Sequence, residues 1–236
     1  MIAGMQLVCL PYAGAGIAPF AKLDRMARPR FAVIAVRLPG REGEIERPAL
    51  RTWPEVRDFL AAEVLPTLTG DYVIYGHSVG ALTGYELCRI AEDRGIPPVA
   101  LCVAAYPGPP VEGAAVQLGI EDDEQLIAYL ARTGEDAAVR ALPREVLELV
   151  LPALRADLGL ADSWRGDGNR ALRTPVLALH GTLDTTMQAP DMLAWKAWTT
   201  GRFETATVTG DHLFVRDQPA QLLAALNAFV AQEVRP

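Results

Sequence analysis

Residues 72–80 read Tyr-Val-Ile-Tyr-Gly-His-Ser-Val-Gly, an apolar run that leads into a Gly-x-Ser-x-Gly pentapeptide. The apolar run predicts a buried strand, and the periodicity of Val79–Arg94 predicts a helix directly after the serine. Between a strand and a helix, this pentapeptide is typical of a sharp turn that exposes a serine hydroxyl at the carboxyl edge of a sheet. Its glycines let strand and helix approach closely. We therefore predict that Ser78 is a nucleophile, against the alternative of a purely structural turn.

Strand-length apolar runs and segments of helical period alternate on both sides of this turn. The expected strands are Gln6–Leu10, Ala32–Val36, Tyr72–Tyr75, Ala100–Ala104, Val176–Leu179 and Phe203–Val208. The expected helices are Pro19–Ala27, Pro54–Leu68, Val79–Arg94, Asp191–Thr200 and Pro219–Glu233. Continuously apolar strands are typical of a parallel sheet that helices cover on both faces. The alternation therefore predicts one α/β domain over residues 1–236 with a mostly parallel sheet.

Two helix ends carry capping signals. Thr52 is a predicted N-cap, with Pro54 in the first turn and Glu55 completing a capping box. Gly95 follows the helix that begins after Ser78, at a position where a left-handed residue is expected. Both signals support the helical interpretation of these segments.

The alternation breaks between Pro107 and Thr174, where the periodicity is helical and no strand is expected. One apolar face, predicted to be kinked at Pro152, comprises Val146, Leu147, Val150, Leu151, Leu154 and Leu158. A second helical run follows the acidic residues 121–124 and ends near Leu130. Long insertions in compact domains often cover a binding site, so we interpret residues 108–173 as a lid over an apolar site. A helical subdomain packed on the core is the alternative.

A serine nucleophile needs a base, and the chain has three histidines. His77 lies inside the turn, where packing and support of the turn are expected. His180 ends the fifth strand, where a buried, hydrogen-bonded role is expected. His212 lies in a loop just before the last helix. The chain order serine, acid, histidine of this architecture makes His212 the predicted base.

The carboxylate that orients the base is expected in a loop that follows a strand between the serine and the histidine. Asp184 lies shortly after the fifth strand and can reach the ring nitrogen of His212 that faces away from the serine. Asp211 is the rival, but adjacent residues seldom orient each other in this way. Asp191 is typical of a helix N-terminus, and Asp157 falls in the lid. Asp184 is therefore the predicted acid.

The fourth expected element is a pair of backbone N–H donors for an oxyanion. Val79 follows the nucleophile at a helix N-terminus, and the second donor is expected in the loop Pro11-Tyr-Ala-Gly-Ala-Gly16. The Gly-Ala-Gly of this loop lacks the spacing of a dinucleotide motif, and no P-loop lysine follows it. The chain has no His-Glu-x-x-His or Cys-x-x-Cys pattern. We therefore expect no bound nucleotide, cofactor or metal.

The composition excludes several classes of protein. The chain has 22 Lys and Arg against 29 Asp and Glu, a formal net charge of -7, which argues against nucleic-acid binding. No run approaches the roughly 20 apolar residues that a membrane span needs. Cys9, Cys88 and Cys102 each lie in an apolar stretch and are expected to be buried free thiols, which suits a reducing compartment. We expect a cytoplasmic protein that binds neither membranes nor nucleic acid.

Several segments, taken in order, resemble type II thioesterases, the stand-alone α/β-hydrolase partners of polyketide synthases and nonribosomal peptide synthetases. The resemblance is carried by Leu10–Gly14, which places the first oxyanion donor on Ala13, by Arg37-Leu-Pro-Gly-Arg-Glu42, by Gly76–Ala81, by Leu151–Asp157 and by Gly210–Phe214. The chain departs from the family pattern at His180-Gly181, at Gly210-Asp-His-Leu213 and in the proline-rich Ala105–Pro110. The last departure predicts a reshaped wall of the acyl pocket.

The resemblance implies an α/β-hydrolase fold and hydrolysis of acyl thioesters from the phosphopantetheine arm of acyl or peptidyl carrier proteins. In the family this activity clears misprimed or stalled acyl groups from a synthase. Ser78, Asp184 and His212 would form the catalytic triad, and the N–H groups of Ala13 and Val79 would hold the oxyanion. The alternatives are a product-releasing thioesterase acting in trans, a small-molecule carboxylesterase and a non-catalytic module that binds carrier proteins.

The distribution of charge points to a docking face for such a partner. Residues 22–57 contain nine basic and five acidic side chains, so this segment is positive within an acidic chain. Carrier proteins of the implied class are generally acidic, and a local basic face would attract them. Arg41, just beyond the carboxyl end of a strand, is the predicted docking residue. A solvated surface with internal ion pairs is the alternative.

Overall fold

The computed structural model describes residues 4–109, 122–132, 143–166 and 171–233. Its centre is a six-stranded sheet in the order β2-β1-β3-β4-β5-β6. All five neighbouring pairs are parallel, which confirms the expected α/β class. The strands are β1 (Met5–Leu10), β2 (Phe31–Ala35), β3 (Tyr72–His77), β4 (Ala100–Ala104), β5 (Val176–Gly181) and β6 (Phe203–Val208).

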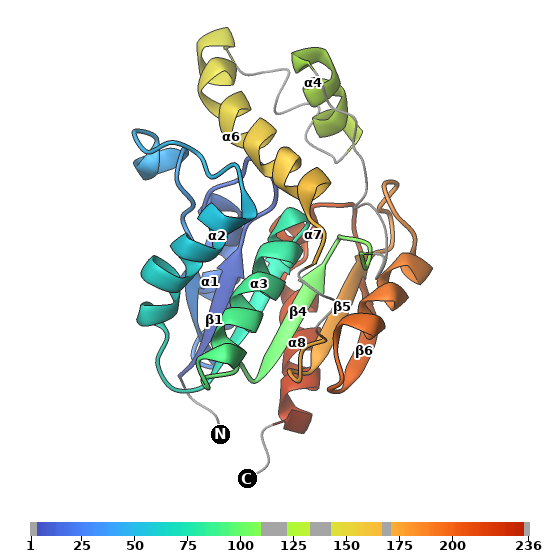
Figure 1. Ribbon diagram of the computed structural model, residues 1–236. Helices are drawn as coiled ribbons and strands as arrows, with labels where there is room; N and C mark the ends of the chain where they lie inside the picture. The colour runs from blue at the N-terminus through green and yellow to red at the C-terminus, as the bar shows by residue number, and fades with distance from the viewer. Residues whose placement is uncertain (1–3, 110–121, 133–142, 167–170, 234–236) are drawn as a thin grey trace.

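Helices lie on both faces of the sheet and at its carboxyl edge (Figure 1). The α-helices are α1 (Ala21–Ala27), α2 (Trp53–Phe59), α3 (Val79–Asp93), α4 (Asp123–Arg132), α6 (Arg144–Ser163), α7 (Phe214–Asp217) and α8 (Pro219–Glu233). Short 3-10 helices span Ala18–Phe20, Glu42–Glu44, Leu65–Thr67 and Ala189–Trp198, and a π-helical turn spans Leu60–Val64. The capping box of Thr52 and Glu55 is formed, and Gly95 has a φ of 74°.

Successive residues of each strand alternate between two cores, because side chains in a strand point to opposite faces. In β3, Ile74 belongs to the cluster that contains α2, α3 and α6, whereas Val73 and Tyr75 belong to the cluster that contains α1 and α8. Both faces of the sheet are therefore buried. This double coverage explains why the strands read as continuous apolar runs.

Two predicted helices have a different geometry from the one expected. The segment expected as a helix over Asp191–Thr200 is a 3-10 helix over Ala189–Trp198. Its buried residues Met192, Trp195 and Trp198 recur every three positions, which matches the three residues per turn of a 3-10 helix.

The segment expected as one helix over Pro54–Leu68 changes to a π-helical turn after Phe59 and then to a 3-10 turn. Pro66 lies at the end of this segment and has no N–H to donate to the preceding turn. A regular α-helix therefore cannot continue to Leu68.

The helices α4 and α6 lie together over the carboxyl edge of the sheet, above α3 (Figure 1). They are the described part of the predicted lid, and residues 110–121, 133–142 and 167–170 of that insertion lie outside the described residues. The helix α6 continues through Pro152. Its predicted apolar face is buried at Leu154 and Leu158, whereas Val150 is exposed. The second half of this face is therefore the more deeply buried part, while Leu147 and Leu151 are partly buried against the same core.

The three cysteines Cys9, Cys88 and Cys102 are buried free thiols, as expected. Burial raises the pKa of each thiol above its ordinary value. Among the described helices, none is both long and apolar enough to cross a membrane.

Candidate active site

Ser78 occupies the sharp turn between β3 and α3. Its backbone φ of 54° lies in the left-handed region, which L-residues other than glycine rarely adopt. The Ser78 N–H donates to the carbonyl oxygen of Ala104 in β4 at 2.8 Å, which fixes the turn to the neighbouring strand. A strained backbone held in this way is a frequent feature of functional sites. The serine side chain therefore stands at the carboxyl edge of the sheet, as the pentapeptide predicts.

The glycines on either side of Ser78 allow segments to approach that a side chain would separate. A Cβ atom at Gly76 would lie 2.1 Å from the carbonyl oxygen of Gly80. A Cβ atom at Gly80 would lie 2.4 Å from the carbonyl oxygen of Leu10, at the end of β1. The start of α3 therefore packs directly against the chain that leaves β1. This contact brings the two predicted oxyanion segments next to each other.

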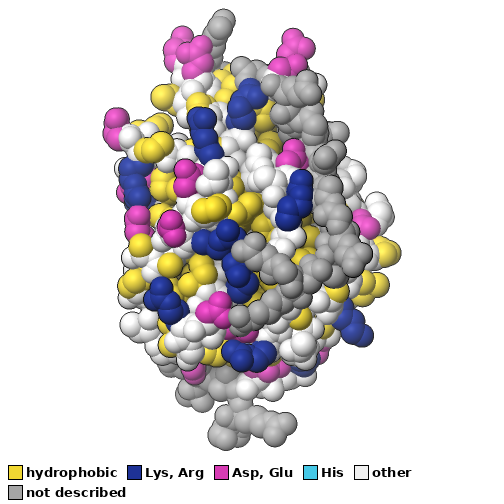
Figure 2. All heavy atoms as spheres, viewed as in Figure 1, with side chains coloured by type: hydrophobic (Ala, Val, Ile, Leu, Met, Phe, Trp, Pro, Cys, Tyr) yellow, Lys and Arg dark blue, Asp and Glu magenta, His cyan; other side chains and the backbone are white. Residues whose placement is uncertain are grey.

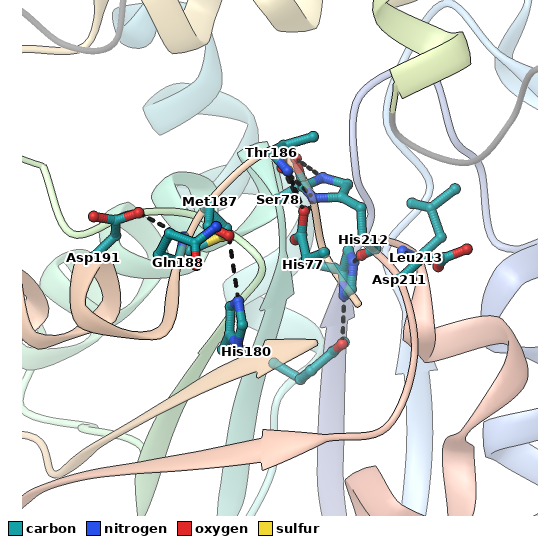
Figure 3. Close-up of polar contacts among 12 residues, drawn as sticks. His77, Ser78, His180, Thr186, Met187, Gln188, Asp191, Asp211, His212 and Leu213 are labelled. Carbon is teal, nitrogen blue, oxygen red and sulfur yellow. Dashed lines mark hydrogen bonds and ion pairs between the residues drawn. The ribbon is translucent and has the colours of Figure 1, made fainter. Parts of the chain in front are cut away.

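The structure brings Ser78, His212 and Asp184 together in one hydrogen-bonded chain, part of which is shown in Figure 3. The His212 Nδ1–H donates to Asp184 Oδ2 at 2.8 Å, which leaves Nε2 to accept from the Ser78 hydroxyl at 3.2 Å. All three residues are buried. The order and the geometry are those of a serine nucleophile, a base and an orienting acid.

Thr186 is a member of the site that the sequence analysis missed. Its backbone N–H and its hydroxyl both donate to Asp184 Oδ1, at 2.8 and 2.7 Å. The other oxygen, Oδ2, is thereby directed to His212. A signal was present in the sequence, because an aspartate followed two residues later by a threonine N–H is a common turn arrangement.

The surroundings of Asp184 keep its carboxyl ionised. Burial raises the pKa of this group, but hydrogen bonds from His212 and Thr186 together lower the pKa by more than burial raises it. The net pKa therefore lies below the ordinary value. An ionised carboxylate beside Nδ1 stabilises the imidazolium that forms when His212 takes a proton. The electrostatic arrangement therefore suits His212 to the role of base.

His77 supports the site from behind. Its side chain is fully buried, and Nε2 donates to the backbone carbonyl oxygen of His212 at 2.6 Å. Its Nδ1 accepts from the Tyr75 hydroxyl at 2.7 Å. Burial, and secondly the neighbouring His212, lower the pKa of His77 to about 3. This neutral ring fits the expected supporting role, and it also positions the loop that carries His212.

The other candidate residues lie outside this chain of hydrogen bonds. His180 is buried, and its Nε2 donates to the carbonyl oxygen of Met187 at 3.5 Å, as Figure 3 shows. Asp211 accepts from the N–H of Leu213 at 2.8 Å, within its own turn. Asp191 accepts from the N–H of Gln188 at 2.7 Å, at the start of the 3-10 helix. These carboxylates have local structural partners.

The two predicted oxyanion donors both lie next to the serine, one at the start of α3 and one in the loop after β1. Val79 is the first residue of α3, where an amide has no acceptor within the helix. Ala13 lies in the loop after β1 and, with Ser78 and His212, lines a small cavity of about 10 Å³. The adjacent Gly14 N–H is engaged by Asp157 Oδ2 at 2.8 Å. Of these two amides in the loop, Ala13 is therefore the one left for a substrate oxygen.

A second cavity, of about 90 Å³, opens at Ser78 on the side of Val79. Its walls are largely apolar and come from the end of β4, from both lid helices and from the loop after β5. The lining residues include Tyr106, Tyr129, Leu158, Ala161 and Met187. Leu158 therefore faces the site, as the lid interpretation requires, and Tyr106 belongs to the proline-rich segment that departs from the family pattern.

Arg41 lies inside the protein and not on its surface. Its side chain is 5% exposed, and Nη1 and Nη2 donate to the Asp157 carboxylate at 2.6 and 2.9 Å. A buried side chain with both of its terminal nitrogens engaged cannot meet the surface of a partner. The expectation that Arg41 contacts a carrier protein directly is therefore corrected.

Ion pairs also occupy much of the basic segment 22–57. Figure 2 shows Lys and Arg side chains interspersed with Asp and Glu on the face formed by α2, α3 and α6. Arginines of the segment with acidic partners are Arg28 with Asp24, Arg37 with Glu42, Arg41 with Asp157, Arg47 with Glu44 and Glu63, and Arg57 with Glu86. These pairs favour the alternative of a solvated surface with internal ion pairs.

Within the described ranges, no group of three or more His, Cys, Asp and Glu side chains is arranged to bind a metal ion. A nucleophile, a base with an orienting acid, and two candidate oxyanion donors surround an apolar cavity. This set can transfer an acyl group to serine and then to water.

Comparison with known proteins agrees with this acyl-transfer chemistry. A family model described as the thioesterase domain matches residues 5–230. The chain is 30% identical to thioesterase PikA5 of Streptomyces venezuelae over 91% of this chain and 76% of that protein. It is 27% identical to the gramicidin S biosynthesis protein GrsT of Aneurinibacillus migulanus over 94% of this chain and 87% of that protein.

Solved structures agree with the sequence relatives. The type II thioesterase BorB from the borrelidin biosynthetic cluster superposes with a TM-score of 0.84 at 29% identity, over 97% of this chain and 93% of that chain. The resemblance to type II thioesterases drawn from the sequence motifs is therefore confirmed, together with the α/β-hydrolase fold. The chain belongs to the thioesterase family, whose members are hydrolases that act on thioesters.

Proposed function

We propose that this thioesterase releases acyl groups from the phosphopantetheine arm of acyl or peptidyl carrier proteins in a polyketide or nonribosomal peptide synthase. Its role there is to clear misprimed or stalled acyl groups. The observation that carries the proposal is the hydrogen-bonded chain Ser78–His212–Asp184 beside an apolar cavity. The names of relatives, which include a gramicidin S biosynthesis protein, support the pathway class.

The first half of the reaction acylates Ser78. His212 Nε2 takes the hydroxyl proton while Ser78 Oγ attacks the thioester carbonyl carbon, and the carbonyl oxygen becomes an oxyanion. The N–H groups of Ala13 and Val79 donate to that oxyanion. When the carbon–sulfur bond breaks, His212 gives its proton to the departing thiolate, so the arm leaves as a free thiol.

The second half restores the enzyme. A water molecule attacks the acyl-serine carbonyl while His212 Nε2 takes its proton, and the same amides hold the second oxyanion. Collapse of this intermediate breaks the bond to Ser78 Oγ, which recovers its proton from His212. The products are the free acid and the intact serine. Asp184 stays ionised throughout and stabilises each imidazolium.

The apolar walls of the larger cavity suit an acyl chain, and the lid helices α4 and α6 supply part of these walls through Tyr129, Leu158 and Ala161. We propose that residues 108–173 act as a lid on this acyl site. The reaction uses side chains and backbone amides alone, so the proposal requires no cofactor or metal. A cytoplasmic location is part of the proposal, supported by the three free thiols.

The decisive experiment measures release of free acid from a panel of carrier proteins loaded with acyl-phosphopantetheine groups of different length. We expect turnover with the wild type and nearly none with Ser78→Ala, which should still fold and bind the loaded carrier. A fluorophosphonate probe should label Ser78 alone. Labelling at another residue, or full activity of Ser78→Ala, would exclude the proposed nucleophile.

The same panel separates the alternatives. A carboxylesterase would hydrolyse small oxygen esters at least as fast as carrier thioesters. A product-releasing enzyme would act on one finished acyl chain and leave short, misprimed chains in place. Binding of loaded carrier without release of any acid would indicate a non-catalytic binding module.

A further inference from the structure

A buried ion pair lies next to the catalytic chain, and no step of the proposed reaction uses it. Arg41 follows β2, and Asp157 lies in the middle of α6. The two planar groups face each other, with Nη1 at 2.6 Å from Oδ2 and Nη2 at 2.9 Å from Oδ1. The side chains are 5% and 4% exposed. This fork-to-fork arrangement gives a strong directional constraint.

The same charged groups hold the loop that follows β1. The Gly14 N–H donates to Asp157 Oδ2 at 2.8 Å. The Arg41 Nη1 donates to the carbonyl oxygen of Ala15 at 3.1 Å. Two successive residues of the loop are thus bound, one through its donor and the next through its acceptor. The ion pair therefore fixes both the position and the orientation of this backbone.

The loop itself is a tight turn whose central peptide has two possible orientations. The Ala15 N–H donates to the Tyr12 carbonyl oxygen at 3.0 Å, and Gly14 has a φ of 73°, which are the features of a type II turn. Type I and type II turns differ by a flip of the central peptide, here the one between Ala13 and Gly14. Gly14 N–H belongs to that peptide. Its bond to Asp157 selects the type II form.

Helix α6 also contacts the turn directly. A Cβ atom at Gly14 would lie 3.2 Å from the Cβ atom of Leu154, one helical turn before Asp157. The turn is therefore in contact with both α6 and Arg41. Three segments that are distant in the sequence meet at Gly14 and Ala15, next to the predicted oxyanion donor Ala13.

We propose that Asp157, held by Arg41, is a positioning residue that fixes the turn Tyr12–Ala15 and so directs the Ala13 N–H at the oxyanion. The inference rests on the proposed function in that it takes Ala13 as an oxyanion donor. A buried ion pair is by itself weak evidence for stability, because apolar residues of similar volume often serve as well. Here the pair has a specific task, since an apolar replacement would leave Gly14 N–H without its acceptor.

The expected consequence is a loss of rate and not of substrate binding. Removal of one oxyanion donor costs about 10²- to 10³-fold in kcat, and displacement of such a donor costs less. Asp157→Asn should therefore lower kcat by about 10- to 100-fold while KM stays within about twofold. The pH dependence of kcat should keep its shape, because His212 and Asp184 are untouched.

The experiment compares three variants at a temperature where each is folded, verified by thermal unfolding. Asp157→Asn tests the carboxylate. The double variant Arg41→Met/Asp157→Leu removes both charges together, which avoids an unpaired buried ion while still depriving Gly14 of its acceptor. Glu92→Gln is the matched control. Glu92 is also a buried carboxylate that holds backbone N–H groups, those of Arg173 and Thr174, but it lies about 20 Å along α3 from Val79.

The readout that separates positioning from mere stability is the affinity for an acyl trifluoromethyl ketone, which adds to serine and places an oxyanion in the hole. In the two site variants its inhibition constant should rise by the factor by which kcat/KM falls. In Glu92→Gln the unfolding temperature should fall while kcat and the inhibition constant stay unchanged. Unchanged kcat in folded Asp157→Asn, or an unchanged inhibition constant in both site variants, would overturn the inference.

Failure of the proposed function would look different. If carrier thioesters are not substrates, the wild type itself will not release acid from them. The rate at which a fluorophosphonate labels Ser78 still depends on the oxyanion hole, so it still compares wild type with Asp157→Asn. Slower labelling of the variant would then support the positioning role, and equal labelling would overturn it.

Discussion

Two buried aspartates organise the two halves of the active site, the catalytic triad and the loop that carries the predicted oxyanion donor Ala13, in different ways. Asp184, on the loop after β5, directs the side chain of His212, which is 28 positions away in the sequence. Asp157, on α6, directs the backbone of Gly14, which is 143 positions away. The first half is assembled from neighbouring loops at one edge of a parallel sheet. The second half requires a helix of the insertion to reach back to the first loop of the chain.

The partners of the two carboxylates differ as well. Asp184 accepts from the neutral groups of Thr186 and from a histidine whose charge changes during the reaction. Asp157 faces the permanent charge of Arg41. Asp184, which stabilises the positive charge that forms on His212 during the reaction, thus has neutral hydrogen-bond donors. Asp157, which holds only a backbone segment, is paired with a permanently charged arginine. The comparison separates a residue that acts during the chemistry from one that prepares the geometry.

The largest effect is expected at the carboxylate that acts during the chemistry. Asp184→Asn should lower kcat by about 10⁴-fold with little change in KM, because the amide favours the wrong tautomer of His212 and cannot stabilise the imidazolium. The measurement is steady-state hydrolysis of an acyl thioester. Asp211→Asn is the control and should stay near the wild type, since Asp211 bonds within its own turn. The reverse ranking would show that the acid is Asp211.

The next effect concerns the free energy of unfolding at acidic pH, and it arises from His77, which packs behind His212. The pKa of His77 is about 3 in the folded protein, against an ordinary value of 6.5. Above pH 6.5 neither the folded nor the unfolded chain carries this proton. Between pH 6.5 and 3 only the unfolded chain binds it, so the free energy of unfolding falls as the pH falls. The slope from this one group is about 1.4 kcal/mol per pH unit.

Urea unfolding of wild type and His77→Gln at pH 7, 6 and 5 checks this slope. The glutamine side chain can still donate to the carbonyl oxygen of His212 but does not titrate. The difference in unfolding free energy between the two proteins should therefore shift in favour of His77→Gln as the pH is lowered. A difference that is independent of pH would show that His77 is protonated in the folded protein to the same degree as in the unfolded chain.

A smaller loss of kcat is expected from substitution of Thr186, the residue that orients Asp184. Thr186→Val removes the hydroxyl that donates to Asp184 Oδ1 but keeps the backbone N–H bond to the same oxygen. A hydrogen bond to a charged group contributes about 1.5–3 kcal/mol, and half of the support remains, so kcat should fall about 20-fold. Thr186→Ser should restore most of the rate. If Thr186→Ser is as slow as Thr186→Val, the methyl group and not the hydroxyl is what matters.

The contrast between the two halves also explains which features of the fold and of the site could be predicted from the sequence. The strands, their parallel direction and the residues Ser78, Asp184 and His212 follow local rules, because the loops after parallel strands meet at one edge. Chain order then assigns the roles. The same rules missed Thr186, whose contribution depends on which oxygen of Asp184 faces His212.

Arg41 shows where such reasoning stops. A charged residue just beyond a strand is usually solvated, and its burial depends on a partner 116 positions away on α6. Periodicity gives the helix that carries Asp157 but not the segment on which that helix packs. The geometry of the segment over Ala189–Trp198 was missed for a related reason, since three-residue spacing of buried tryptophans is close to the helical period.

The smallest effect distinguishes two leucines of α6 that are one helical turn apart. Leu158 lines the cavity at Ser78, whereas Leu154 packs on Gly14 in the turn that Asp157 holds. Leu158→Ala enlarges the cavity and should shift the ratio of kcat/KM for octanoyl over acetyl thioester about fivefold toward octanoyl. This is less than the roughly tenfold or more that a methylene is worth in an enclosed pocket. Leu154→Ala should slow both substrates by the same factor. An equal loss on both substrates in Leu158→Ala, in step with its thermal stability, would favour a purely structural α6 over a lid that reads the acyl chain.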